Sequence, residues 1–174
     1  MNIFFHVLTG AAAAGMATRI LAPTRSPSKQ YLVACGALVA AGVLIHGLLD
    51  IAPHHYPFRA APDIAISTGL IVVILASVRP ESTVLVGASI FGSVLPDLID
   101  LGPTMLAEIS GIDLRFTDRK IFFWHTPEFS GSIYDGSRAF ESHIYHALVV
   151  LTVGCSMFAT WNDLARKSLT KRHS

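Results

Sequence analysis

The chain has 174 residues, of which 52% are hydrophobic and only 14% are charged, and its formal net charge is +1. Because a soluble globular domain carries about 25% charged residues, this composition excludes water as the main solvent, and the balanced charge gives no sign of a nucleic-acid partner. We therefore expect an integral membrane protein with a single membrane domain, residues 1–174.

Five apolar runs follow along the chain, each close to the roughly 20 residues that cross a bilayer as a helix. They cover residues 3–22, 31–51, 64–78, 84–101 and 142–164, and the prolines at positions 23, 53, 62 and 80 lie next to their ends. The first run has no basic segment before it and contains His6, so we interpret it as a retained helix rather than a signal peptide. The sequence predicts an all-α fold, a polytopic membrane helix bundle of about five transmembrane helices.

One long polar segment, residues 102–141, separates the fourth run from the fifth. It combines an amphipathic stretch, residues 105–116, with the aromatic side chains of Phe122, Phe123 and Trp124. A floppy loop is one interpretation, but these aromatic side chains are too apolar to be left in water at little cost. We expect the segment to lie on the membrane surface as a packed extracytoplasmic lid.

The basic residues predict the orientation of the bundle, because short cytoplasmic loops are enriched in Lys and Arg. Eight of the 13 fall on the side of the first loop: Arg19, Arg25, Lys29, Arg79, Arg166, Lys167, Lys171 and Arg172. We therefore expect that side to be the cytoplasm of a cell (inner) membrane protein, with the N-terminus outside and the C-terminus in the cytoplasm.

Histidines gather on the opposite, extracytoplasmic side if the runs alternate in direction. Seven of the eight fall there, namely His6, His46, His54, His55, His125, His143 and His146, whereas His173 does not. Seven histidines scattered independently over two faces would rarely agree in this way. The coincidence indicates a shared site.

Polar pairs with helical spacing support this interpretation. His46 and Asp50 are four residues apart, and the pairs Asp97 and Asp100, and His143 and His146, are each three apart. Such spacings place both side chains on one stripe of a helix, where they can reach one ion. An ionised Asp in hydrocarbon costs a few kcal/mol, so acids inside a membrane are paired, solvated or bound to cations. The alternatives are a buried hydrogen-bonded pair for His46 and Asp50 and a solvated helix end for Asp97 and Asp100.

Imidazole and carboxylate ligands suit zinc, and also iron, manganese or nickel. We predict a divalent metal, with zinc as the first choice, and the predicted ligands are His46, Asp50, His55, Asp97, His143 and His146. Asp100 and His125 are the predicted catalytic residues, Asp100 as a group that handles protons and His125 as a residue of the lid. Which of His6, His54, His55 and His125 join the site stays open at this point, and His125 is either a ligand from the lid or an interfacial residue.

Three segments resemble a known family: His6-Val-Leu-Thr-Gly10, Gly92-Ser-Val-Leu-Pro96-Asp97-Leu-Ile-Asp100 and Ser142-His143-Ile-Tyr-His146. The family is the membrane-bound metal-dependent hydrolases of the LexA-binding, inner-membrane-associated type. The three segments resemble, in this order, its early His before a Gly, its Pro-Asp-x-Asp element and its late helix start that contains His. Here the second aspartate follows the first by three positions instead of two. The resemblance implies a hydrolase. The His46-x-x-x-Asp50 spacing is also loosely similar to that of zinc-dependent phospholipase C, which implies phosphoester substrates.

The predicted function is a membrane-embedded metal-dependent hydrolase that acts on a lipid or lipid-linked ester or phosphoester at the extracytoplasmic face. Two alternatives use the same residues. A metal-ion or proton carrier would need polar side chains across the whole membrane, and they are few in the cytoplasmic halves of the runs. A haem-binding electron-transfer protein usually holds its haem midway along the bundle, whereas these histidines lie near helix ends.

Overall fold

The structure, a computed structural model, describes residues 1–20, 29–111, 120–135 and 137–165. Its elements in chain order are α1 (Ile3–Ile20), α2 (Lys29–Ile51), α3 (Ala60–Ser77), α4 (Pro80–Asp100), α5 (Gly102–Ser110), the 3-10 helix η1 (Phe123–His125) and α6 (Ala139–Leu164). Within these residues all the regular secondary structure is helical, so the all-α prediction is confirmed. Helices α3 and α4 each begin four residues before the predicted run; for α4, Pro80 occupies the first turn, where its missing N–H costs nothing.

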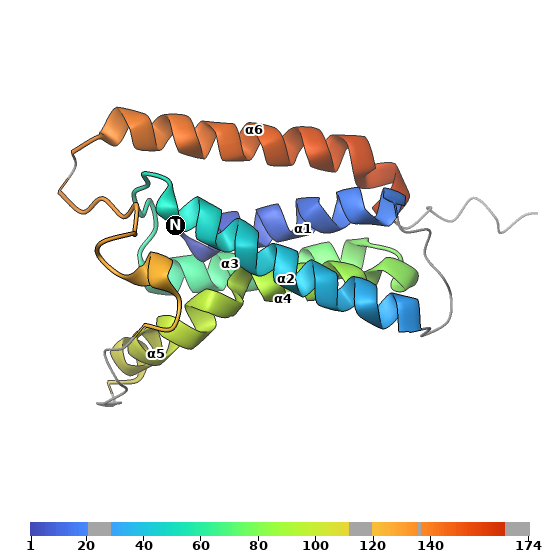
Figure 1. Cartoon of the computed structure of the whole chain (residues 1–174), viewed down its shortest axis with the longest axis horizontal. Coiled ribbons are helices and arrows are strands. Elements are labelled where there is room, and N and C mark those ends of the chain that lie inside the picture. Colours follow the sequence, from blue (N-terminus) through green and yellow to red (C-terminus); the bar gives the residue numbers. More distant parts are fainter. Residues whose placement is uncertain (21–28, 112–119, 136, 166–174) are drawn as a thin grey trace, which may run out of the picture.

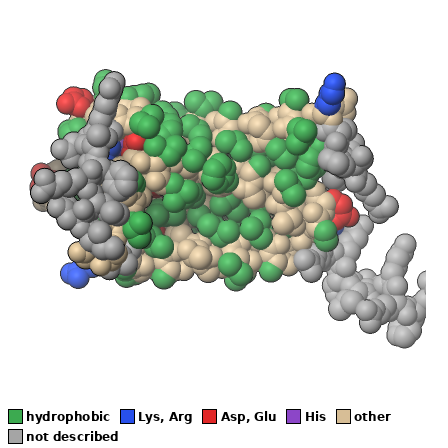
Figure 2. Space-filling model, turned by 90° about the horizontal axis from the view of Figure 1, so that it is seen from below, with side chains coloured by type: hydrophobic (Ala, Val, Ile, Leu, Met, Phe, Trp, Pro, Cys, Tyr) green, Lys and Arg blue, Asp and Glu red, His purple; other side chains and the backbone are tan. Residues whose placement is uncertain are grey.

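Four helices, α2, α3, α4 and α6, are long and apolar enough to cross a membrane. Helix α1 is a shorter apolar helix, with its apolar part at Ile3–Thr18. At 1.5 Å per residue its 18 residues extend about 27 Å, close to the roughly 30 Å hydrocarbon core. On the face shown in Figure 2, hydrophobic side chains cover the middle and charged ones lie at the two ends, as expected for a helical membrane bundle.

The helices run side by side with alternating direction, and α6 lies along α1 (Figure 1). Helices α1 and α4 contribute most of the buried apolar core, which also takes in the end of α3 and Leu164 of α6. Its members are Val7, Ala11, Ala14, Ile74, Val78, Val86, Ile90, Val94 and Leu164. Because α4 is packed on several sides, polar groups at its end are held away from lipid.

Helices α2 and α4 cross in near contact because glycines face each other there. A Cβ atom on Gly92 would lie 2.2 Å from the carbonyl oxygen of Val39, and one on Gly42 would lie 2.6 Å from the backbone nitrogen of Ser93. Small residues of this kind let membrane helices approach closely. The crossing fixes the residues that follow it on each helix, His46 on α2 and Asp97 on α4, at the same end of the bundle.

The segment between α4 and α6 covers that end of the bundle in part. Trp124 of η1 is only 8% exposed, whereas its neighbour Phe123 is 51% exposed. The Trp124 ring lies on α2 at Gly47, where an added Cβ would meet the ring at 2.8 Å. Trp124 therefore packs on the bundle, and the lid as a whole stays a prediction. Residues 112–119, which include the second part of the predicted amphipathic stretch, lie outside the described residues.

Candidate metal centre

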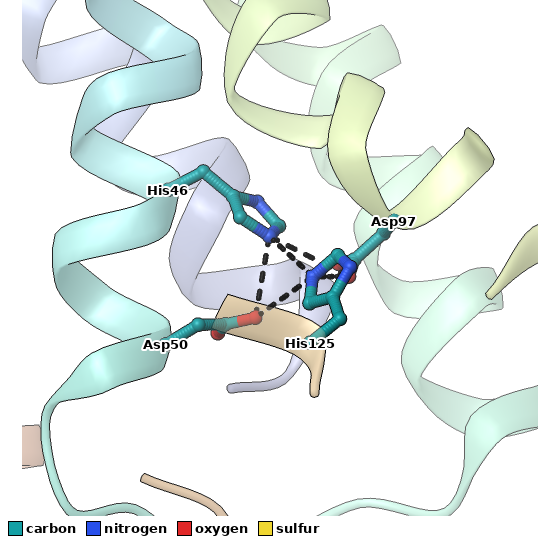
Figure 3. A group of neighbouring side chains, drawn as sticks. All are labelled: His46, Asp50, Asp97 and His125. Carbon is teal, nitrogen blue, oxygen red and sulfur yellow. Dashed lines mark hydrogen bonds and ion pairs between the residues drawn. The ribbon is translucent and has the colours of Figure 1, made fainter. Parts of the chain in front are cut away.

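Four side chains from three elements converge at the covered end of the bundle (Figure 3). His46 and Asp50 come from α2, Asp97 from α4 and His125 from η1, and one ligand atom of each lies within 4.8 Å of all the others. His46, Asp50 and Asp97 are buried, and the His125 side chain is 4% exposed. This group could hold a metal ion.

The spacing of the four atoms matches the ligand cage of a small divalent cation. The Nε2 atoms of His46 and His125 are 3.1 Å apart, and each lies 3.2 Å from Oδ2 of Asp50. Oδ1 of Asp97 lies 3.6 Å from Nε2 of His46 and 3.4 Å from Nε2 of His125. A tetrahedron around an ion with bonds of about 2.0 Å has edges of about 3.3 Å. These five edges, 3.1 to 3.6 Å long, therefore fit a small divalent cation.

Hydrogen bonds on the far side of each imidazole define which nitrogen is free to bind a cation. Nδ1 of His46 lies 2.8 Å from the carbonyl oxygen of Ser93, which can only accept, so Nδ1 carries the proton and donates it. Nδ1 of His125 lies 2.9 Å from Oδ2 of Asp100 and donates in the same way when the ring is neutral. In neutral imidazoles both Nε2 atoms then present lone pairs to the centre, next to two carboxylate oxygens. Four acceptors that face one another in a buried site repel unless a cation or proton lies between them.

Asp100 supports His125 from outside the four-atom group. Besides His125, its carboxylate accepts the backbone N–H groups of Ile121 and Phe122, each at 2.9 Å. A carboxylate behind a metal-binding histidine fixes the tautomer and orientation of the ring. The geometry thus gives Asp100 a positioning role, next to the proton-handling role predicted from the sequence.

The His125 ring lies between the carboxylates of Asp50 and Asp100. Burial of its ring opposes the charged form, but the hydrogen bonds to Asp50 and Asp100 outweigh this effect and raise the pKa of His125 above its ordinary value. A proton therefore competes with a metal ion for Nε2 of this residue. From the sequence His125 is a predicted catalytic residue of the lid or a lid ligand, and the structure places it in the candidate ligand group.

His6 lies directly behind the centre. Its ring is fully buried and stacks on the ring of His46, with centroids 3.9 Å apart and an interplanar angle of 18°. Nε2 of His6 lies 3.2 Å from Oδ1 of Asp50, and among the described residues neither buried ring nitrogen has a partner in full hydrogen-bond geometry. A buried polar group without a partner is costly, so this ring is a further candidate for metal or proton binding. The sequence signal for it was its position near the start of an apolar run.

The second oxygen of Asp50 faces the amino end of the chain. The Met1 amino group lies 2.5 Å from Oδ1 of Asp50 and 2.7 Å from Nε2 of His54. His54 donates its Nδ1 proton to the carbonyl oxygen of Ala52, 2.7 Å away, so Nε2 is the acceptor. Burial, followed by the nearby amino group, lowers the pKa of His54 from 6.5 to about 4. His54 is thus a neutral neighbour of the centre, outside the group of four.

The structure does not bring His55, His143 and His146 into this group. His143 is exposed, and its ring stacks on that of His55 with centroids 6.2 Å apart. His146 lies against Phe5, 4.7 Å between ring centroids, and its Nδ1 is 2.8 Å from the carbonyl oxygen of Ser142. His143 and His146 are on α6, which packs on α1. His55 lies in the loop between α2 and α3. Metal ligation by the three remains a prediction.

Comparison with family models, with curated proteins and with solved structures finds no match to this chain. The resemblance to membrane-bound metal-dependent hydrolases therefore stays a prediction, and the functional argument rests on the geometry of the centre.

Proposed function

We propose that this protein is a membrane-embedded metal-dependent hydrolase, with zinc as its metal, that cleaves an ester or phosphoester bond of a lipid or lipid-linked substrate. The observation that carries the proposal is the convergence of two imidazole Nε2 atoms and two carboxylate oxygens in a buried site with the edge lengths of a zinc cage. The Nδ1 contacts of His46 and His125 support it, since they turn both lone pairs inward.

The four side chains His46, Asp50, Asp97 and His125 would hold the metal. A bound divalent ion supplies a Lewis acid that polarises a carbonyl or phosphoryl oxygen. Asp100 holds His125 in place through Nδ1. His6, whose buried Nε2 lies 3.2 Å from Oδ1 of Asp50, is our candidate for accepting and returning a proton. Burial of the centre keeps bulk water from competing for these groups.

In this proposal the centre opens at the extracytoplasmic face, and the N-terminus lies outside. The support is the sequence distribution of Lys and Arg, which favours the first-loop side as the cytoplasm. A lipid from the outer leaflet would then reach the centre without crossing the membrane.

The test is hydrolysis by the purified, zinc-loaded protein in detergent, with p-nitrophenyl fatty-acyl esters and bis(p-nitrophenyl) phosphate as probes. We expect turnover of at least one probe class, loss of turnover after chelation and recovery on adding zinc. Asp97→Asn should lower turnover at least 100-fold, whereas Glu128→Gln, which changes an acid outside the helices, should leave it unchanged.

A metal-ion carrier is the rival that the same experiment must exclude. Zinc-loaded protein that hydrolyses none of the probes, but moves labelled zinc across proteoliposome membranes in a manner that Asp97→Asn abolishes, would overturn the hydrolase proposal. The buried, one-ended position of the four ligands favours hydrolysis over transport, because a carrier needs a polar path to the opposite side.

A further inference from the structure

An apolar pocket adjoins the candidate metal centre at Asp97. It lies between α3, α4 and α5 and has a volume of about 400 Å³. Asp97 is part of its lining, together with apolar side chains that include Ile71, Val94 and Leu106. Ligand pockets in proteins commonly measure roughly 300 to 1,000 Å³. Asp97 therefore belongs both to the four-residue group and to the wall of a cavity of ligand size.

The pocket extends along α3 from Ile64 to Ile71. Asp97, Ser67 and Thr68 are the polar side chains in its otherwise apolar lining, and Ile71 lies one helical turn beyond Ser67. Ile71 is 11 residues from the start of α3, about 16 Å along the helix axis and thus near the middle of a bilayer. The pocket therefore runs from the level of the metal centre towards the bilayer centre. A lipid molecule in the leaflet that contains the metal centre is oriented in the same direction, with its polar group at the membrane interface and its tail towards the bilayer centre.

The mouth of the pocket is continuous with the surface that faces lipid. Leu98 and Leu106 line the pocket and are 53% and 57% exposed on helices α4 and α5. Their exposed parts continue onto the apolar outer surface of the membrane-spanning helices, to which Phe91 of α4 also belongs. A hydrocarbon chain can thus enter from the bilayer without passing through water.

We propose that this pocket binds one hydrocarbon chain of a membrane lipid and thereby places the ester or phosphoester bond of that lipid at the metal centre. The inference rests on the proposed function and adds the place where the substrate is held: a pocket for one long alkyl or acyl chain. Charge complementarity supports this occupant: a divalent cation beside Asp97 attracts a phosphate or ester oxygen, and the rest of the lining offers a chain only apolar and hydroxyl groups. A water-soluble ester would leave most of the pocket unfilled.

The experiment is photo-crosslinking in liposomes of phosphatidylglycerol and phosphatidylethanolamine. The probe is a lysophosphatidylglycerol with a diazirine midway along its acyl chain, and mass spectrometry locates the adducts. We expect adducts concentrated on Ile71, Val94 and Leu98, and at least fivefold less labelling there in Ile71→Trp, which fills the pocket. Val72→Trp is the matched control, since Val72 is the next residue of α3, is 62% exposed and does not line the pocket.

Thr68→Phe, also in the pocket lining, gives a second variant in case Ile71→Trp fails to fold, and it should lower the labelling in the same way. Labelling spread evenly over the outer surface of α3, with Val72 and Val73 modified as strongly as Ile71, would mean contact with bulk lipid only and would overturn the proposal. So would normal labelling of the pocket in both filled variants.

A metal-free variant separates this inference from the proposed function. His46→Gln removes a candidate metal ligand but leaves the pocket lining intact, so we expect it to lose hydrolysis and keep pocket labelling. If the wild type labels in the pocket but hydrolyses nothing, the proposed function fails and the lipid site stands. If it hydrolyses esters whereas Ile71→Trp and Thr68→Phe leave KM for long-chain esters unchanged, the hydrolase stands and the lipid site fails.

Discussion

Nδ1 of His125 lies 2.9 Å from Oδ2 of Asp100, and the same carboxylate accepts the backbone N–H groups of Ile121 and Phe122. One acid at the end of α4 thus holds both the histidine and the backbone that leads to it. Metal affinity should therefore depend on a residue that does not contact the metal.

Replacing Asp100 by Asn should weaken zinc binding by about 10- to 100-fold, because the variant removes the charge that orients His125 and favours its Nδ1 proton. Competition with a chromogenic chelator measures the affinity. Asp135→Asn is the matched control, since Asp135 is an exposed acid in the loop before α6. Equal affinity in the Asp100→Asn variant and the wild type would argue against a positioning role.

Zinc affinity should fall as the pH is lowered from 8 to 6. Asp50 and Asp100 raise the pKa of His125, so a proton occupies Nε2 at higher pH than on a free histidine and must leave before metal binds. Calorimetric titration in two buffers of different ionisation enthalpy would measure the protons released. Binding with no proton release near pH 6.5 would contradict the assignment of His125 as a ligand.

The helix crossing at Gly92 should tolerate no side chain. A Cβ at this position would lie 2.2 Å from the backbone oxygen of Val39, so Gly92→Ala must push α2 and α4 apart. We expect a loss of about 1–3 kcal/mol in unfolding free energy and weaker zinc binding, measured by unfolding in mixed detergent and sodium dodecyl sulfate micelles. Gly154→Ala on α6, where the added Cβ meets nothing within 4 Å, should be harmless.

The metal-free protein should lose stability between pH 6.5 and pH 4 because of His54. Burial and the Met1 amino group lower its pKa from 6.5 to about 4, so on acidification the unfolded chain takes up a proton before the folded one does. His54 therefore costs no stability above pH 6.5 and at most about 3 kcal/mol once the pH reaches 4. Denaturation curves of the wild type and His54→Gln should show a smaller pH slope for the variant. Parallel slopes would be evidence against a buried neutral His54.

Much of the centre could be predicted from local spacing alone. His46 and Asp50 are four residues apart near the end of the second apolar run, and Asp97 lies near the end of the fourth. Because successive runs alternate in direction, the second and fourth runs end on the same side of the membrane. The helix ends were predictable to within a few residues because prolines mark them. No local pattern, however, shows that the carbonyl of Ser93 orients His46, because this contact depends on how closely α2 and α4 approach at their glycines.

The rotation of α6 could not be predicted in the same way. His143 and His146 share a stripe, but α6 is apolar around most of its circumference, so the hydrophobic pattern does not say which stripe faces the bundle. In the structure Ser142 is buried and His143 is exposed. His125 lies in a segment without helical periodicity, so only the folded path of the lid brings it to the centre. The sequence leaves the role of His6 open for a related reason: a single histidine has no second polar residue at helical spacing to indicate a site.

The proposed function requires a metal ion held by His46, Asp50, Asp97 and His125, and elemental analysis of the purified protein tests this most directly. After expression with added zinc and extraction in detergent, we expect about one zinc ion per chain in the wild type and in Glu128→Gln, and less than a tenth of that in His46→Gln and in Asp97→Asn. Wild-type protein without stoichiometric transition metal, both as purified and after incubation with zinc followed by desalting, would contradict the account.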